Sequence, residues 1–460
     1  MPTCRINGQT VTFRDGATIL ETARQAGIDI PTLCYIKNLN RPAACRMCVV
    51  EIEGMAKLMP ACVTKAQEGM AIQTESEKVV ESRKKTLDLM CQNHRMDCEY
   101  CPNYTFCELH ALLRRYGVDD RLYSQVYHSR NADETSPCIV RDPSKCVLCR
   151  RCVSACQKQG LSVPGPLHRA FGTKIGTIVP LGESDCMGCG QCVRNCPTGA
   201  LFVRNDSDEL LRAVNRKKHI VFGITRHTAE NIGRFFGERE PADHMGKLFA
   251  LLKKAGAEAV FDVTDWGDDT LQSAAKAVKA ATGSAAVTRC PAAAKALAGE
   301  MELIQIPSTE QVFASKMRTE YASANGLSPE DIFTVYVSPC SAAKREHESD
   351  LVLTTTELHA WLMRVCVSKF TLRDVWNKTQ PEELPSREEG PSWYEKLRDF
   401  CGVGIKLALA DGLAQARTLV NSGEQKIAVW ACPRGCVNGG GQFRAEAWKA
   451  LGGSGKEIKQ

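Results

Sequence analysis

The sequence predicts a multidomain protein of mixed α+β and α/β class. The chain has 460 residues, which exceeds the usual size of one domain. It has 24 cysteines, and those before residue 200 fall mainly into four groups. After about residue 213 strands alternate with helices, which is typical of an α/β domain with a largely parallel sheet. We therefore expect four domains, over residues 1–78, 79–125, 126–212 and 213–460.

Composition and charge exclude several classes of protein. The hydrophobic fraction of 43% and the charged fraction of 24% are ordinary for a soluble globular chain. The net charge of +6 is spread without a long basic run, so we expect no nucleic-acid partner. The N-terminal stretch MPTCRINGQTVTF has no apolar signal region, and no run of 18 apolar residues follows. We expect a cytoplasmic protein without a membrane span, in which so many cysteines indicate metal binding.

The first domain is expected to be a ferredoxin-like β-grasp fold. The stretch RINGQTVTF predicts a hairpin with Asn-Gly at its turn, and ATILETARQAG predicts a helix that ends at Gly27. Cys34, Cys45, Cys48 and Cys62 follow. One cysteine, a gap of ten, a C-x2-C pair and a distant fourth cysteine indicate a 2Fe–2S cluster held by a loop. A zinc site is the alternative.

The second domain is expected to be small and helical, with one histidine among its ligands. The stretch CQNHRMDCEYCPNYTFCELH contains His94, Cys98, Cys101 and Cys107. A helix would place His94 and Cys98 on one face, because they are four residues apart. One histidine and three cysteines suit a 4Fe–4S cluster or a zinc ion.

The third domain repeats one cysteine pattern, C-x2-C-x2-C-x3-C, and the second copy is followed by Pro197. This pattern is the signature of bacterial ferredoxins with two 4Fe–4S clusters, in which the fourth cysteine of each run ligates the other cluster. The expected ligand sets are Cys146, Cys149, Cys152 and Cys196 for one cluster, and Cys186, Cys189, Cys192 and Cys156 for its neighbour.

The last domain places cysteines after three predicted strands. SAAVTRC ends at Cys290, IFTVYVSPC ends at Cys340 and KIAVWAC ends at Cys432, with Cys436 following. Ligands of α/β sheets bind at the carboxyl ends of strands, so these four thiols are expected to meet and to hold a 4Fe–4S cluster. Four buried structural thiols are the alternative. The triple glycine at 439–441 suits a turn beside a cofactor.

These motifs, together with CPRGCVNGGGQ, SPCSAAKRE and RCPA, make the chain similar to the iron-only hydrogenases over nearly its whole length. The resemblance implies that Cys290, Cys340, Cys432 and Cys436 hold a 4Fe–4S cluster, with Cys436 as the bridge to a two-iron centre that makes or splits dihydrogen. The first 200 residues also resemble the large iron–sulfur subunit of respiratory NADH dehydrogenases.

The departures from that family lie on the side of the two-iron centre. Arg289 replaces the proton-donating cysteine, Ser338 and Trp430 replace methionines, and Ala343 replaces the lysine that binds cyanide. Arginine does not titrate usefully, and loss of the lysine removes a charge-assisted hydrogen bond. We expect no catalytic residue at this degenerate pocket and no two-iron centre, while the five iron–sulfur clusters are kept.

The favoured function is an electron-transfer subunit of a multisubunit, NAD(P)H-linked and electron-bifurcating hydrogenase or oxidoreductase complex. No nucleotide motif is found in this chain, so the resemblance implies a flavin- and NAD(P)-binding partner subunit. It also implies a small iron–sulfur subunit, a separate hydrogenase module and ferredoxin as partners. Two alternatives stay open. One is an atypical active iron-only hydrogenase with Lys344, Glu346 or water as proton donor, and the other is a redox sensor.

Overall fold

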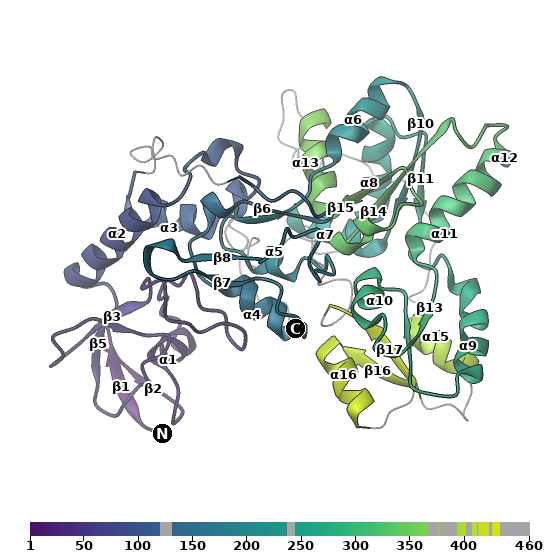
Figure 1. Cartoon of the computed structure of the whole chain (residues 1–460). Helices are drawn as coiled ribbons and strands as arrows, with labels where there is room; N and C mark the ends of the chain where they lie inside the picture. The colour runs from purple at the N-terminus through teal and green to yellow at the C-terminus, as the bar shows by residue number, and fades with distance from the viewer. Residues whose placement is uncertain are drawn as a thin grey trace.

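The computed structural model describes residues 1–119, 131–236, 244–366, 376, 393–401, 407–411, 413–422 and 426–432. The N-terminal domain lies at one end of the molecule, and two α/β lobes lie at the other end (Figure 1). The third domain, which contains the two cysteine runs, lies in the middle and is called the ferredoxin-like domain from here on. No helix in these ranges is long and apolar enough to cross a lipid bilayer.

The first domain is built on a five-stranded mixed sheet in the order β2-β1-β5-β3-β4. Its strands are β1 (Thr3–Ile6), β2 (Gln9–Thr12), β3 (Val49–Ile52), β4 (Met59–Pro60) and β5 (Ala71–Gln73). The predicted hairpin is confirmed: Asn7 and Gly8 take left-handed φ values of 53° and 82° between β1 and β2. The predicted helix is α1 (Ile19–Gln25), which Thr18 caps and which Gly27 follows with a φ of 75°.

The second domain packs α2 (Glu77–Gln92) against α3 (Glu108–Tyr116). The prediction that one helix carries both His94 and Cys98 is wrong, because α2 ends at Gln92 and a short 3-10 turn begins only at Cys98. Contacts with the next domain hold the intervening residues out of the helix. The Arg95 amide donates to the Ser144 carbonyl at 3.0 Å, and Asp97 pairs with Lys145 at 3.0 Å.

The third domain contains two antiparallel strand pairs and two short helices. β6 (Ile139–Arg141) pairs with β9 (Leu201–Val203), and β7 (Gly165–Leu167) pairs with β8 (Lys174–Gly176). The helices are α4 (Arg151–Lys158) and α5 (Gln191–Asn195). Each begins directly after a left-handed residue, Arg150 at 63° or Gly190 at 68°, so the two cysteine runs fold in the same way.

The first α/β lobe is a parallel sheet in the order β11-β10-β14-β15. The strands are β10 (His219–Ile224), β11 (Ala259–Asp262), β14 (Ile332–Ser338) and β15 (Leu351–Thr354). The helices α6 (Ser207–Asn215), α7 (Arg226–Phe235), α8 (His244–Lys254) and α13 (Thr355–Cys366) cover one face. Helix α11 (Thr309–Lys316) lies on the other face.

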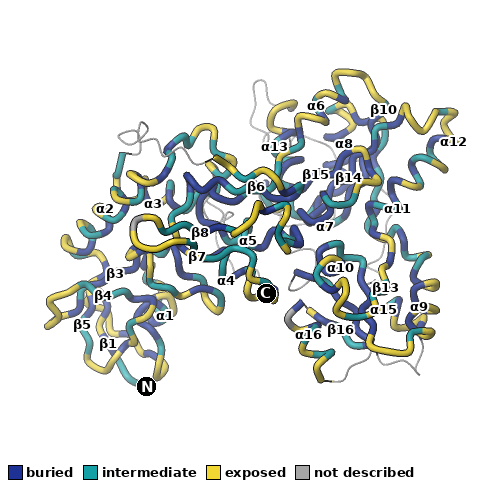
Figure 2. Tube along the Cα trace, viewed as in Figure 1, coloured by how far each residue is buried: buried dark blue, intermediate teal, exposed yellow. Residues whose placement is uncertain are grey.

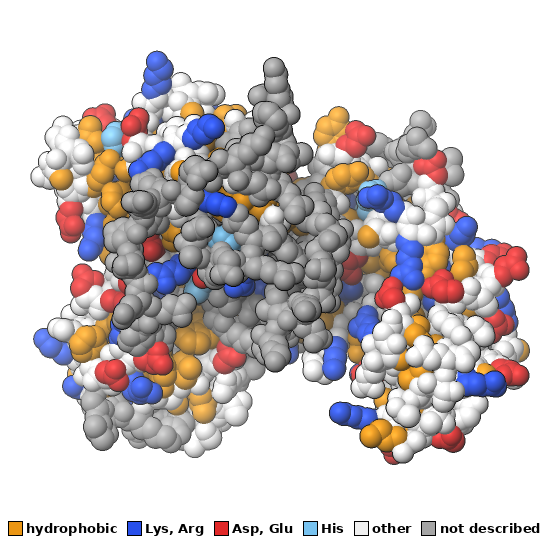
Figure 3. Space-filling view, turned by 180° about the vertical axis from the view of Figure 1, so that it is seen from behind, with side chains coloured by type: hydrophobic (Ala, Val, Ile, Leu, Met, Phe, Trp, Pro, Cys, Tyr) orange, Lys and Arg blue, Asp and Glu red, His pale blue; other side chains and the backbone are white. Residues whose placement is uncertain are grey.

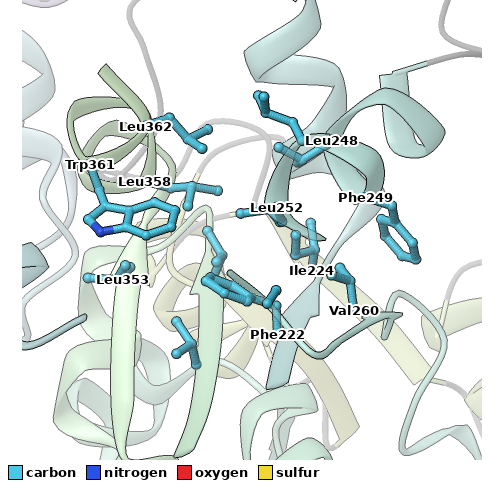
Figure 4. Close-up of a cluster of buried hydrophobic side chains, with 14 of the residues drawn as sticks. Phe222, Ile224, Leu248, Phe249, Leu252, Val260, Leu353, Leu358, Trp361 and Leu362 are labelled. Carbon is cyan, nitrogen blue, oxygen red and sulfur yellow. The ribbon is translucent and has the colours of Figure 1, made fainter. Parts of the chain in front are cut away.

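Large apolar side chains fill the space between this sheet and its four helices (Figure 4). Phe222 from β10, Leu252 from α8 and Trp361 from α13 are fully or almost fully buried there. Burying one such side chain stabilises a fold by roughly 1.5–3 kcal/mol. Strands β10, β14 and β15 of this lobe are buried along most of their length (Figure 2). The lobe is therefore a rigid support for the residues at its strand ends.

The second lobe is a separate parallel sheet in the order β13-β12-β17-β16. Its strands are β12 (Ala285–Thr288), β13 (Glu302–Gln305), β16 (Leu407–Asp411) and β17 (Lys426–Trp430). Helices α9 (Leu271–Ala280) and α15 (Trp393–Cys401) cover one face, and α10 (Pro291–Leu297) and α16 (Leu413–Asn421) cover the other. The expectation of one sheet is thus corrected to two: β12 and β17 share a sheet, while β14 belongs to the other.

Candidate metal centres

The four cysteines of the first domain gather in one buried loop. The thiols of Cys34 and Cys45 share a hydrogen bond, which lowers the pKa of Cys34 and, with burial, raises the pKa of Cys45. Cys48 and Cys62 form a second such pair, with the lower pKa at Cys62. Ala43 in the same loop has a left-handed φ of 52°. Four thiols held together in this way fit a 2Fe–2S cluster.

The second set brings three thiols together beside helix α3. Burial first, then Cys101 and Cys98 nearby, raise the pKa of the Cys107 thiol to about 12. His94 lies beside Lys145, and burial with this cation lowers the pKa of the imidazole to about 4. Its Nδ1 atom is buried and has no hydrogen-bond partner within the described ranges. A neutral imidazole is the form that binds metal.

The eight cysteines of the ferredoxin-like repeat line one apolar cavity. Burial and Cys196 raise the pKa of Cys149 to about 12, and burial with the same neighbour raises the pKa of Cys152. In the other set burial comes first, and Cys186 and Cys156 both add to the raised pKa of Cys192. The fourth cysteine of each run therefore lies beside the first three cysteines of the other run, which is the arrangement that the repeat predicts.

Backbone amides point at these sulfurs. The amide of Arg151 donates to Cys149, and the amide of Gln191 donates to Cys189, at the equivalent place in the second run. Gly188 donates to the Cys186 sulfur at 3.4 Å. Amides that favour the thiolate, in an apolar cavity lined by eight thiols, fit a pair of 4Fe–4S clusters.

The last set lies where the two lobes meet the ferredoxin-like domain. Cys340 follows β14 of the first lobe, whereas Cys290 and Cys432 follow β12 and β17 of the second. Cys290 and Cys340 pack in one cluster of side chains with Ala431, and the Ala431 amide donates to the Cys290 sulfur. The structure thus brings Cys290 and Cys340 together, and Cys432 directly follows Ala431 of the same cluster. Cys436 and the triple glycine at 439–441 lie outside the described residues.

Among the described residues, no three His, Cys, Asp or Glu side chains converge closely enough to hold a single metal ion. The cysteine sets instead surround wider spaces, as the cavity of the ferredoxin-like domain shows.

Arg289 is held by the loop between the two lobes. Its guanidinium donates to the Gly267 carbonyl at 2.5 Å and to Asp268 Oδ1 at 3.2 Å, and only 12% of the side chain is exposed. Burial lowers the pKa of this guanidinium, although Asp268 opposes the shift. Lys396 also binds Asp268, at 2.6 Å. Arg289 therefore has a structural partner and is positioned as a link between β12 and the segment that follows β11.

The two positions near Cys340 have structural partners of their own. The Ser338 hydroxyl accepts a hydrogen bond from the Cys340 amide at 3.1 Å. The Ala343 methyl group packs in the apolar core on the α11 face of the first sheet. Lys344 points elsewhere, because its ammonium binds Asp206 at 2.5 Å and Glu357 at 2.9 Å.

Trp430 ends strand β17 opposite Asp411 of β16. Its indole nitrogen donates to Asp411 Oδ1 at 3.0 Å. This bond holds the ring at the ends of these two strands.

Two amide side chains that belong to no motif connect one cysteine set to another. Asn40 Nδ2 donates to the Cys34 carbonyl at 2.7 Å and to the Cys149 carbonyl at 3.0 Å, so it joins the first loop to the ferredoxin-like repeat. Gln191 Nε2 donates to the Cys432 sulfur at 3.4 Å, although 241 residues separate them. No sequence signal marks either residue, apart from the position of Gln191 inside a cysteine run.

Other contacts complete this series of neighbouring sets. Gly199 lies so close to Cys101 that a Cβ atom there would collide with the cysteine sulfur. This glycine follows Cys196 by three residues, so the second set adjoins the same ferredoxin-like set as Asn40 does. Cys189 packs against the side-chain cluster that contains Cys340. The five cysteine sets therefore form a continuous series. The first and second sets both adjoin the set of Cys146, Cys149, Cys152 and Cys196, and the other ferredoxin-like set adjoins the C-terminal set.

Comparison with protein families identifies domains along the chain. A 2Fe–2S iron–sulfur cluster binding domain matches residues 2–77, and the NADH-ubiquinone oxidoreductase-G iron–sulfur binding region matches residues 83–121. A 4Fe–4S dicluster domain matches residues 145–200. The C-terminal domain of the iron-only hydrogenase large subunit matches residues 218–390.

Curated relatives cover the chain in two ways. The NADP-reducing hydrogenase subunit HndD of Solidesulfovibrio fructosivorans is 29% identical, over 96% of this chain and 88% of the relative. Iron hydrogenase 1 of Clostridium pasteurianum is 27% identical, over 96% of this chain and 89% of the relative. The alpha subunit of the NADPH-Fe(3+) oxidoreductase of Geobacter sulfurreducens is 37% identical, over 44% of this chain and 24% of the relative. In domain order, this chain thus has iron–sulfur domains followed by a domain that matches the C-terminal domain of the iron-only hydrogenase large subunit, and it is similar to such subunits over 96% of its length.

Proposed function

We propose that the chain is the electron-carrying iron–sulfur subunit of a multisubunit NAD(P)H-linked, electron-bifurcating oxidoreductase. The observation that carries the proposal is the continuous series of ligand sets, joined by Asn40 at one end and by Gln191 at the other. The similarity to an NADP-reducing hydrogenase subunit and to a subunit of an NADPH-Fe(3+) oxidoreductase supports the link to a nicotinamide cofactor. The match of residues 83–121 to an NADH-ubiquinone oxidoreductase region supports the same link.

We assign five clusters to the cysteine sets described above. Cys34, Cys45, Cys48 and Cys62 would hold a 2Fe–2S cluster, and His94 would join the three thiols of its set at a 4Fe–4S cluster. The two ferredoxin-like sets and the C-terminal set, with Cys436 as its fourth member, would hold three more 4Fe–4S clusters. When bound, such clusters accept and release single electrons. The chain contributes thiolates, amides and an apolar setting that keeps water away from them.

We further propose that the chain has lost the two-iron centre of the iron-only hydrogenases. The supporting observations are the partners of the replaced residues. Arg289 is bound to Asp268 and Gly267, and the Ala343 methyl group lies in an apolar core. Lys344 cannot take the place of the missing lysine, because two carboxylates hold it. A group that must donate protons or bind cyanide has to be free to do so.

The chain therefore needs partners that supply and remove its electrons. A flavin- and NAD(P)-binding subunit and a small iron–sulfur subunit are proposed on one side. Ferredoxin and a separate hydrogenase module, such as a nickel-iron enzyme, are proposed on the other. Acidic and basic side chains are interspersed on the visible described part of the face in Figure 3, so this view does not single out one charged docking patch.

Iron content and infrared spectroscopy test the proposal together. The full chain is expressed in a host that matures iron-only hydrogenases, purified without oxygen, and analysed for iron and for CO and cyanide bands. We expect about 18 iron atoms per chain, against about 20 with a two-iron centre. No CO or cyanide bands and no dye-linked dihydrogen activity are expected. Such bands would instead identify an active iron-only hydrogenase and overturn the loss of the two-iron centre.

A further inference from the structure

Side chains of the C-terminal domain bind the loop that carries Cys186 and Cys189. Lys295 Nζ, on α10, donates to the Cys186 carbonyl at 2.9 Å. Arg345 Nη2 donates to the same oxygen at 3.0 Å. Ser341 donates to the Gly188 carbonyl at 2.8 Å. Two cations from another domain thus meet at one ligand residue of the ferredoxin-like repeat.

The positive charge at this loop is not neutralised by carboxylates of the described residues. No ion pair within those ranges includes Lys295 or Arg345, whereas neighbouring Lys344 binds two carboxylates. The Arg345 Nε atom is buried without a hydrogen-bond partner there, and a Cβ atom on Gly188 would lie 3.1 Å from it. The guanidinium therefore lies directly against the loop between two proposed cluster ligands.

A third residue, Cys138, lies at the same loop. The Cys138 thiol lies beside Gly188, 2.7 Å from the position of a Cβ atom there. Burial raises the pKa of Cys138 to about 11, and Arg345, Lys344 and Lys295 all oppose that shift. The two cations of the C-terminal domain thus lie beside a loop that packs against a fully buried residue, and a low dielectric there strengthens electrostatic interactions.

We propose that Lys295 and Arg345 raise the reduction potential of the 4Fe–4S cluster held by Cys156, Cys186, Cys189 and Cys192. Reduction adds one negative charge to a site that already has four thiolates, and nearby positive charge stabilises the reduced form. The C-terminal domain thereby changes the reduction potential of a cluster in the neighbouring ferredoxin-like domain. This inference rests on the proposed function, because it assumes that these cysteines hold a cluster.

Redox titration of the full chain, followed by electron paramagnetic resonance, tests this role. In the double variant Lys295→Met and Arg345→Met, we expect the equilibrium constant for reduction of one 4Fe–4S cluster, followed by its signal, to decrease at least tenfold. For a one-electron couple that is a shift of about 59 mV to lower potential. Lys295→Arg and Arg345→Lys should keep most of the wild-type potential, because they retain the charge.

Lys276→Met is the matched control. It removes the same charge from α9, which covers the other face of the second sheet from α10. Unchanged 4Fe–4S potentials, within the shift of this control, would overturn the inference while leaving the proposed function intact. Absence of the 4Fe–4S signals from the wild-type chain would contradict the proposed function itself. If Arg345→Met reduces the iron content, Lys295→Met decides, because its side chain is exposed and its loss does not disturb the core.

Discussion

The ferredoxin-like domain and the C-terminal domain use the same kind of ligand in different surroundings. In the ferredoxin-like domain eight cysteines line one apolar cavity, and repeated backbone turns aim amides at their sulfurs. In the C-terminal domain Cys290 and Cys340 meet at strand ends, but Arg289 beside Cys290 is occupied by structural partners. The same strand ends therefore present both the cysteines that we propose as ligands and side chains with purely structural partners.

Packing explains how the C-terminal domain approaches its neighbour so closely. The side-chain cluster around Cys340 is rich in alanine, with Ala292, Ala342 and Ala431 fully buried, and it also includes Met187 of the ferredoxin-like repeat. Small side chains let backbones come together, which is what the bonds of Lys295 and Gln191 to the other domain require. The two regions thus differ in their sites but share one interface.

The largest effect is expected from loss of a ligand in the ferredoxin-like domain. Cys192→Ala should remove about four iron atoms per chain and one 4Fe–4S signal, because a three-cysteine set cannot complete the cluster. Cys340→Ala should remove the same amount of iron but leave the ferredoxin-like signals. Cys401→Ala is the control, since this buried thiol belongs to no set. Full iron content in the Cys192→Ala protein would contradict the ligand assignment.

Loss of the ion pairs that join the two regions should have the next largest effect. Lys344→Met leaves Asp206 and Glu357 without their cation, and removing one partner of a buried pair costs roughly 3–5 kcal/mol. Urea unfolding of the full chain measures this cost. Arg364→Met is the matched control, because its pair with Asp208 is exposed and is expected to contribute at most about 1 kcal/mol. Equal losses in the two variants would rule out a special role for Lys344.

A smaller effect is expected at Arg289, which we propose to occupy the position of a proton donor. Arg289→Met removes the bonds to Gly267 and Asp268, but Lys396 still pairs with Asp268, so the expected loss of stability is roughly 1–3 kcal/mol. Thermal unfolding of the C-terminal domain measures it, with exposed Arg398→Met as the control. An increase in stability would show that Arg289 is strained, contrary to the structural role described above.

The effect expected at Glu346 depends on pH and falls to nearly nothing in acid. Burial, with Glu310 and Glu348 nearby, raises the pKa of this carboxyl to about 8 from an ordinary value of 4.5. The folded state therefore holds a proton that the unfolded state has released, and stability falls as pH rises between these values. Glu346→Gln should be more stable than wild type by up to roughly 4 kcal/mol at pH 8 and nearly equal to it at pH 4.5. Unfolding curves measure both proteins at each pH. The same stability difference between variant and wild type at pH 4.5 and pH 8 would contradict the buried proton.

Much of the fold could be predicted from the sequence, because its signals are local. The Asn7-Gly8 turn needs left-handed backbone that these residues adopt easily, and the two cysteine runs encode their own helices and turns. The prediction of a helix through His94 and Cys98 was wrong because contacts distant in the sequence decide that segment. Bonds from Arg95 and Asp97 to another domain decide that segment, and spacing along the chain contains no trace of them.

The sequence by itself determined which residues are ligand candidates, since cysteine spacing is a property of the chain. Only the tertiary structure decided that β12 and β14 lie in different sheets, and that Asn40 and Gln191 join separate sets. It also decided that Lys344 is bound by carboxylates while Lys295 and Arg345 lie at the Cys186 carbonyl. The physical reason is that charge and hydrogen bonding act through space, over distances that bear no relation to separation along the sequence.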